Sequence, residues 1–167
     1  MGLRSDHVSG TSFAPRGQTP IVRATGQRFG CNMISAITNR GHLAFMVFHG
    51  KFDGRLFIRF MQRLLKQAPG KLYLIVDGHP VHRSVAAKKF VSANEERLRL
   101  IRLPGYCPEL NPDELLNQDV KTNGLGKSRP TDRTEMMAGV RSHLRRRQRQ
   151  PQVIRNLFQE KHVRYAA

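Results

Sequence analysis

The acidic side chains best suited to chemistry lie at the ends of predicted elements. A short apolar run at residues 72–76 is followed directly by Asp77, and Glu114 opens a helical segment just beyond a second apolar run, residues 98–103. If these runs are parallel strands, their carboxyl ends meet at the sheet edge where open α/β folds bind ligands and metals. Two carboxylates at that edge could hold Mg²⁺, which activates water and stabilises in-line displacement at phosphorus.

Both acids also have purely structural interpretations. Asp77 could cap a turn or helix after its strand. Glu114 could simply interact favourably with the N-terminal dipole of its helix, and the same holds for Asp113 and Asp119. The charge of the chain favours the metal interpretation, because carboxylates facing a phosphate backbone would repel it unless a divalent cation lay between them. Asp113 and Asp119 are expected to point away from such a site.

The net charge points to a polyanionic partner. The 167 residues include 29 Lys and Arg against 12 Asp and Glu, which gives +17 and an isoelectric point near 11.3. Nucleic acid is the first candidate for so basic a chain, and an anionic membrane surface is the second. No apolar run is long enough to span a membrane, and the first residues lack the apolar core of a signal peptide. These features predict a single cytoplasmic domain.

Several basic side chains are candidates for contact with phosphate. They are His82, Lys121, Arg145, Arg146, Arg147 and Arg149. The arginine run could instead form a solvated helix face. His79 and His82 could form a metal pair, although no further ligands lie close by, and His82 could equally serve as a hydrogen-bonding group. The cysteines, Cys31 and Cys107, show no disulfide or zinc spacing, and Cys31 is expected to be a buried free thiol.

The predicted elements alternate in a way that brings the acids together. Residues 31–38 and 42–48 should form a hairpin, and Asp53 should cap an amphipathic helix. Residues 72–76 should form a strand buried on both faces, followed by a helix capped by Ser84 and a parallel strand at 98–103.

The two ends of the chain are predicted to differ. Residues 1–25 read as loop, with one short strand at 21–22. Asn111 and Pro112 should begin the helix that carries Glu114, which should end at Asn123 and Gly124. Thr131 should cap a further helix with Met136, Met137, Val140 and Leu144 on its apolar face, and a last amphipathic piece follows.

Two segments carry a family resemblance. Residues 76–82 read VDGHPVH and residues 103–114 read LPGYCPELNPDE. They resemble the catalytic core of DDE-type transposases, in the bacterial insertion-sequence branch related to mariner. That branch has a strand ending in Asp, often as Asp-Asn-x-x-x-His, and then Leu-Pro-x-Tyr-Ser-Pro-x-Leu-Asn-Pro-x-Glu at the last catalytic acid. Residues 14–20, APRGQTP, resemble the segment after the family's first catalytic strand.

The resemblance assigns Asp77 as the second catalytic acid and Glu114 as the third. Gly78 and Cys107 replace the usual Asn and Ser, and the Trp that usually follows the Glu is absent, with Asn117 near its place. The family's first Asp ends a strand just before the segment that matches residues 2–5. We therefore expect this chain to lack the first acid, its strand and the upstream helix-turn-helix region.

The resemblance implies a ribonuclease-H-like α/β fold, a mixed sheet flanked by helices and lacking its first, central strand. Residues 1–167 would be a partial DDE transposase catalytic domain, with 127–167 a basic helical C-terminal extension. The intact family uses two Mg²⁺ (or Mn²⁺) ions to cleave and join double-stranded DNA, both transposon ends and target, and a homodimer is one assembly it allows. The truncated chain should be inactive. A non-catalytic basic nucleic-acid-binding module is the alternative, and a nuclease unrelated to transposition is the third.

Overall fold

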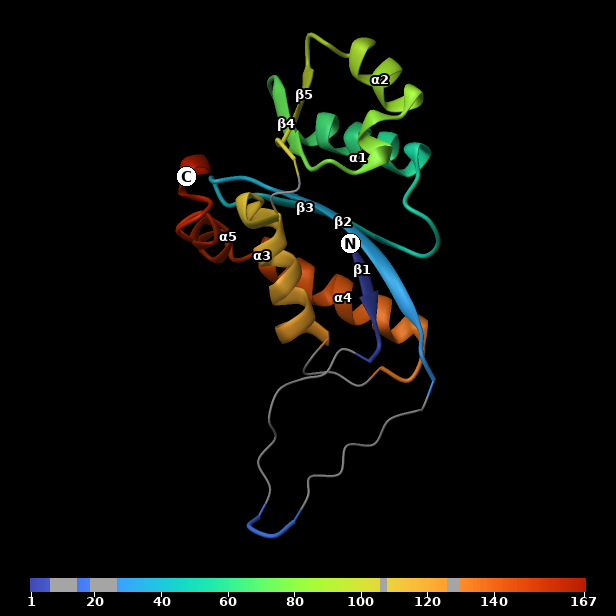
Figure 1. Ribbon diagram of the computed structural model, residues 1–167, viewed down its shortest axis with the longest axis vertical. Coiled ribbons are helices and arrows are strands. Elements are labelled where there is room, and N and C mark those ends of the chain that lie inside the picture. Colours follow the sequence, from blue (N-terminus) through green and yellow to red (C-terminus); the bar gives the residue numbers. More distant parts are fainter. Residues whose placement is uncertain (7–14, 19–26, 106–107, 126–129) are drawn as a thin grey trace.

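The computed structural model describes residues 1–6, 15–18, 27–105, 108–125 and 130–167. Within them lie two β-sheets and a set of helices (Figure 1). The α-helices are α1 (Gly54–Gln67), α2 (Val85–Ser92), α3 (Pro112–Asp119), α4 (Arg133–Gln148) and α5 (Pro151–Leu157). No helix in the described ranges is long and apolar enough to cross a membrane.

One sheet is antiparallel and contains the predicted hairpin. Its strands are β1 (Gly2–Arg4), β2 (Gly30–Ile37) and β3 (Leu43–Phe48), in that order. The hairpin turn requires Gly41, whose φ is 90° and whose added Cβ would lie 2.5 Å from the Pro151 carbonyl oxygen. Only glycine fits both conditions, so the turn also fixes the approach of α5 to the hairpin.

The start of the chain was predicted as loop, and that prediction is wrong for Gly2–Arg4. This segment pairs with β2, and its Leu3 side chain is 2% exposed in the core. The Met1 amino group extends this pairing by donating to the Met33 carbonyl at 2.8 Å. Three residues are too few for an alternation pattern to reveal the strand. The strand predicted at residues 21–22 lies outside the described residues.

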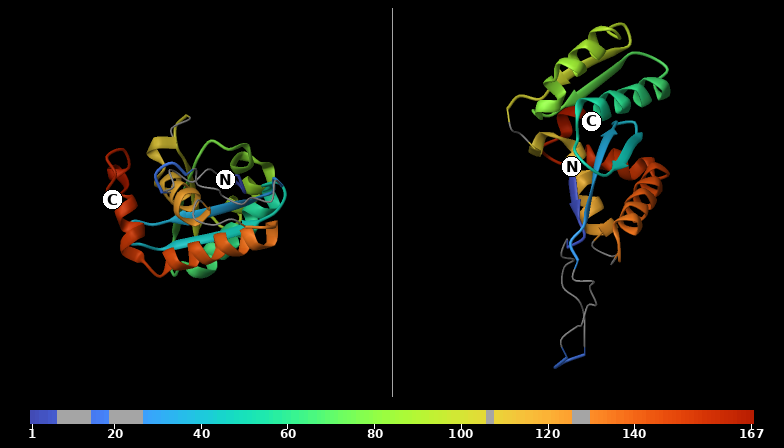
Figure 2. Two further views of the ribbon diagram at one scale, coloured as in Figure 1. Left: turned by 90° about the horizontal axis from the view of Figure 1, so that it is seen from below. Right: turned by 90° about the vertical axis from the view of Figure 1, so that its right-hand side faces the viewer.

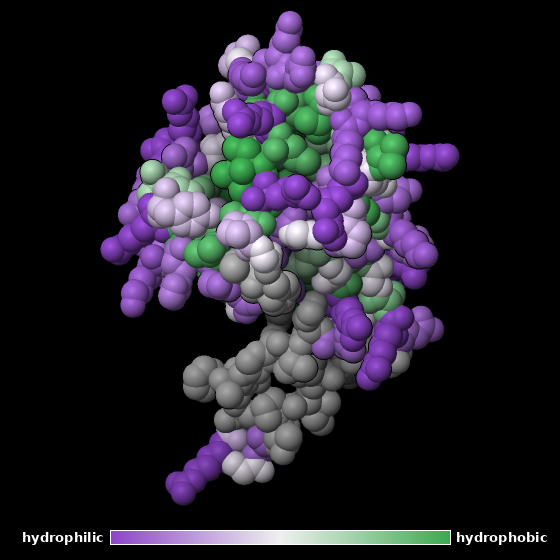
Figure 3. Space-filling view, turned by 45° about the horizontal axis from the view of Figure 1, so that its top comes forward, coloured by the Kyte–Doolittle hydropathy of each residue, from purple (hydrophilic) through white to green (hydrophobic). Residues whose placement is uncertain are grey.

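The second sheet is parallel, as predicted, and consists of β4 (Leu72–Val76) and β5 (Leu98–Arg102). α1 and α2 both cover the same face of it, so the expectation of burial on both faces is wrong. On the other face Tyr73 is 58%, Ile75 50% and Ile101 40% exposed. Apolar surface is visible in this half of the molecule (Figure 3).

Two apolar clusters hold the elements together. The first lies where α3, α4 and α5 pack on the antiparallel sheet, and it includes the buried free thiol of Cys31. The second joins α1 and α2 to β4 and β5, and residues from the opposite face of β2 and β3 pack against it. The antiparallel sheet is therefore covered on both faces (Figures 1 and 2). Within the described residues the two sheets share no strand pair, so the expected mixed sheet is divided in two.

Most helix starts follow the predicted caps. Asp53 accepts from the Leu56 N–H at 2.9 Å, Ser84 from Ala87 at 3.2 Å and Asn111 from Asp113 at 3.1 Å. The prediction that Thr131 caps α4 is wrong by one residue.

Asp132 caps α4 instead, because it accepts from the Glu135 N–H, while the Thr131 N–H and hydroxyl both donate to the Glu135 carboxylate. α3 continues into a π-helical turn, Val120–Leu125, that the sequence did not indicate.

Candidate active site

The two predicted acids reach the same region of the fold. Asp77 follows β4, and Glu114 lies in the first turn of α3. Their common location is marked by the Met1 amino group: burial lowers its pKa, while the charges of Asp113, Glu114 and Asp77 raise it, in that order. The charges of these three carboxylates thus all act on the Met1 amino group, which lies beside β2. The α/β topology therefore brings together residues that the sequence separates.

Asp113 does not point away, and that expectation is wrong. Its Oδ2 accepts a hydrogen bond from the Ser35 hydroxyl on β2 at 2.8 Å, and its Oδ1 is buried without a hydrogen-bond partner in the described part of the chain. The pKa of the Asp113 carboxyl is raised to about 6, mainly by burial and also by the charges of Glu114 and Asp77, while the Ser35 hydrogen bond and the Met1 amino group oppose this shift. Asp113 is therefore directed toward β2, and its charge interacts with those of Glu114 and Asp77.

The Asp77 carboxylate is in contact with the buried ring of His82. The Asp77 Oδ1 accepts from the His79 N–H at 2.9 Å and lies 3.0 Å from the His82 Nδ1, which is also 3.2 Å from the Asp77 carbonyl oxygen. The Asp77 side chain is 54% exposed, whereas that of His82 is 9% exposed.

The His82 ring packs 4.6 Å from the ring of Phe57, measured between centroids. Burial lowers the pKa of His82, although the contacts with Asp77 oppose this shift. The contact with Asp77 fits the hydrogen-bonding role predicted for His82, and its contact with DNA stays a prediction. The His79 ring also makes a hydrogen bond within the protein, since its Nδ1 accepts from the Val81 N–H.

The donor chemistry of the acids suits a hard divalent cation. Carboxylate oxygens are the ligands that Mg²⁺ and Mn²⁺ favour, and the unpartnered Oδ1 of Asp113 is an acceptor still unused. Within the described residues, however, no group of three or more His, Cys, Asp or Glu side chains is placed to hold a metal ion. The described side chains of Asp77, Asp113 and Glu114 therefore do not form a complete set of metal ligands.

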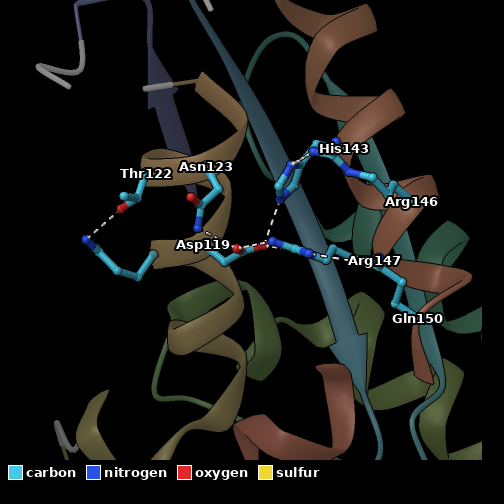
Figure 4. Close-up of polar contacts among 8 residues, drawn as sticks. Asp119, Thr122, Asn123, His143, Arg146, Arg147 and Gln150 are labelled. Atoms are coloured by element: carbon cyan, nitrogen blue, oxygen red, sulfur yellow. Dashed lines mark hydrogen bonds and ion pairs between the residues drawn. The ribbon is translucent and has the colours of Figure 1, made fainter. Parts of the chain in front are cut away.

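Asp119 points away from the acids, as expected, and forms a separate polar cluster with α4 (Figure 4). Its Oδ2 accepts from Arg147 Nε and lies 2.7 Å from His143 Nε2, and its Oδ1 accepts from Arg147 Nη2 at 2.6 Å and from Asn123 at 3.0 Å. Arg147 is 17% exposed. It is thus engaged inside the protein and is not a free cation for DNA.

The other predicted basic residues differ in their exposure and in their contacts. Arg145 and Arg149 are exposed at the end of α4. Arg146 is exposed but lies with Nη2 3.0 Å from His143 Nδ1. Lys121 is half-buried, and its charge lowers the pKa of the Met1 amino group. The phosphate contacts predicted for these four cations stay predictions.

Sequence reasoning missed three contributors, namely Ser35, the inward orientation of Asp113, and His143. Ser35 and Asp113 lie 78 residues apart, and His143 and Asp119 lie 24 apart. For His143 the one available signal was that a polar side chain falls on the predicted apolar face of α4.

Comparison with known proteins gives a family and a fold. The family model for the DDE superfamily endonuclease matches residues 1–137. The fold resembles that of the Mos1 mariner paired end complex with Mn (TM-score 0.64, 11% identity) and of the Mos1 transposase paired-end complex with left transposon end (0.65, 13%). The chain is covered over 100% and 99% of its length and spans 54% of each of those chains.

The catalytic domain of Mos1 mariner transposase is also similar, with a TM-score of 0.54 and 7% identity over 79% of this chain and 78% of that one. None of the curated proteins matches. The ribonuclease-H-like fold expected from the sequence is thereby confirmed.

Proposed function

The chain belongs to the DDE superfamily endonuclease family, and we propose that it is the catalytic-domain part of a transposase that cleaves and joins DNA during insertion-sequence transposition. The observation that carries this proposal is that the charges of Asp77, which follows β4, and of Asp113 and Glu114, in the first turn of α3, all act on the Met1 amino group. In a chain of charge +17, three such carboxylates are better explained by a shared cation than by capping alone.

In this proposal Asp77 and Glu114, with Asp113, would hold Mg²⁺ or Mn²⁺. The metal, when bound, would supply a Lewis acid that activates water and offsets charge at phosphorus. The side chains of the protein have supporting tasks. His82 orients the Asp77 carboxylate from its buried position, and Ser35 orients Asp113. With a pKa of about 6, Asp113 is mostly ionised at neutral pH and takes up a proton as the pH falls below that value.

Double-stranded DNA, both transposon end and target, is the proposed substrate, and a homodimer is the proposed assembly. Arg145, in the last turn of α4, and Arg149, directly after it, are better placed to bind phosphate than Arg146 and Arg147, because both are exposed while Arg146 contacts His143 and Arg147 contacts Asp119. Since the proposed substrate is DNA, the cytoplasm is the proposed compartment. Changing both arginines to Ala should reduce the log–log salt slope of DNA binding by about 0.9 for each phosphate that is no longer neutralised. The same change at Arg147 should lower stability instead.

A non-catalytic nucleic-acid-binding module is the second candidate. It is favoured by the fact that no metal-binding group of three side chains is assembled within the described residues. The two candidates differ in whether the acids are needed for anything beyond folding.

Metal binding tests this difference. We would titrate Mn²⁺ into the wild-type chain and into Asp77→Asn, Asp113→Asn and Glu114→Gln, and follow free Mn²⁺ by electron paramagnetic resonance. Glu96→Gln is the matched control, because Glu96 is an exposed carboxylate outside the site. The proposal expects each site variant to weaken Mn²⁺ binding at least about tenfold, or about 1.4 kcal/mol, while the control binds as the wild type does. Equal binding by all variants, together with metal-independent DNA binding, would favour the non-catalytic module.

A further inference from the structure

A groove lies between α2 and β5. It has a volume of about 470 Å³. Within the described residues β5 pairs only with β4, so its other edge is unpaired, and α2 lies beside it (Figure 1). Val91, Leu98 and Leu100 give the groove an apolar floor. Its charged lining consists of Arg83, Lys88, Arg99, Arg102 and Glu95.

The positive charge of the groove is concentrated at the end nearest Asp77. Arg102 stands opposite Val76, the residue before Asp77, in the β4–β5 register, and Arg83 directly follows His82 in the turn that leads from Asp77 to α2. The single acid, Glu95, lies beyond the far end of α2, close to where β5 begins. An anion in the groove would therefore be drawn toward the candidate site.

One side chain forms a wall that the groove shares with the candidate site. His82 lines the groove, and its Nδ1 lies 3.0 Å from the Asp77 Oδ1. The groove and Asp77 are thus separated by no more than one imidazole ring. A ligand at the positive end of the groove would lie next to the acid that the family resemblance assigns to catalysis.

We propose that this groove binds the phosphodiester backbone of a DNA strand leading to Asp77, an inference that rests on the proposed function. Arginine presents a planar fork of donors that matches phosphate, and three of the four cations are arginines. The described lining includes no Phe, Tyr or Trp on which bases could stack. Binding should therefore be through the backbone and show little sequence preference.

Paired charge variants test the groove directly. We would measure binding of a short fluorescein-labelled duplex by anisotropy from about 50 to 200 mM salt. The groove variant is Arg83→Gln with Arg102→Gln. The control is Arg59→Gln with Arg63→Gln, which removes the same charge from the exposed face of α1, outside the groove. We expect the groove variant to bind at least about fivefold more weakly than the control, with a slope smaller by about 1.8 if each arginine neutralises one phosphate.

The outcomes separate this inference from the proposed function. If the wild-type chain binds no DNA, both are overturned. If it binds DNA and the two variants weaken binding equally, the groove inference alone is overturned, since net charge then explains the effect.

A photocrosslink makes the test independent of the variants' folding. We would place p-benzoylphenylalanine at Ser92 in the groove, with Gln62 on α1 as the control position. Crosslinking of DNA from Ser92 and not from Gln62 supports the proposal. Crosslinking of polyglutamate in place of DNA would overturn it, because the groove would then fit an acidic protein segment.

Discussion

Replacing Asp119 with Ala should cost far more stability than its position on a polar helix suggests. The carboxylate accepts two hydrogen bonds from Arg147, one from Asn123 and one from His143. The His143 side chain is 3% exposed, and those of Arg147 and Asp119 are 17% and 16% exposed. Without Asp119, an arginine and a buried histidine would lose the acceptor that offsets their desolvation.

The expected loss is about 3 kcal/mol. Leaving a buried charged group unpaired costs about 3–5 kcal/mol, and the lower end applies because the cluster is partly open to solvent. For a domain of this size that corresponds to a fall in melting temperature of roughly 6–12 °C. Asp53→Ala is the matched control, since it removes an exposed helix cap and should cost about 1 kcal/mol.

Urea unfolding followed by circular dichroism measures both variants, with Arg147→Ala and the double variant completing a thermodynamic cycle. A loss at Asp119 no larger than at Asp53, or additive losses at Asp119 and Arg147, would refute the reasoning.

The pH dependence gives a second check. Burial alone would raise the pKa of Asp119, but the hydrogen bonds from His143, Arg147 and Asn123 outweigh it and hold the pKa well below its usual range. Because the folded-state pKa is depressed, the contribution of Asp119 is complete above the unfolded value of about 3.9 and is lost as the pH falls toward the folded-state pKa. The stability difference between wild type and Asp119→Ala should therefore shrink as the pH falls below about 4.

Three further predictions concern other positions. Gly124→Ala should destabilise the fold by about 1–2 kcal/mol in urea unfolding, because the new Cβ would lie 3.2 Å from His143 Cγ and both ring nitrogens of His143 are engaged. Gly139→Ala, with nothing within 4 Å of its Cβ in α4, should instead stabilise by about 0.5–1 kcal/mol. Ser35→Ala should raise the pKa of Asp113 above about 6, because the Ser35 hydrogen bond favours its ionised form. A carbon-13 NMR titration of the carboxyl that shows no rise would contradict the assigned hydrogen bond.

The sequence alone determined the features that depend on local pattern. The hairpin, the amphipathic face of α1, the caps at Asp53, Ser84 and Asn111, and the parallel pairing of β4 with β5 all follow from spacing and turn chemistry. The prediction that Asp77 and Glu114 meet at one sheet edge came from the right-handedness of crossover connections and from the meeting of parallel strand ends there. The family resemblance likewise came from contiguous segments, residues 76–82 and 103–114.

Tertiary structure decided which side chains are free to act. His82 and Arg147 look alike in sequence as basic residues, yet one is buried beneath Asp77 and the other is held by Asp119. Asp113 turns inward because its partner Ser35 lies on a strand 78 residues away. The exposed face of β4 and β5 arises because α1 and α2 pack on the same side of the sheet. Each of these outcomes depends on partners distant in sequence, and no local pattern encodes such an interaction.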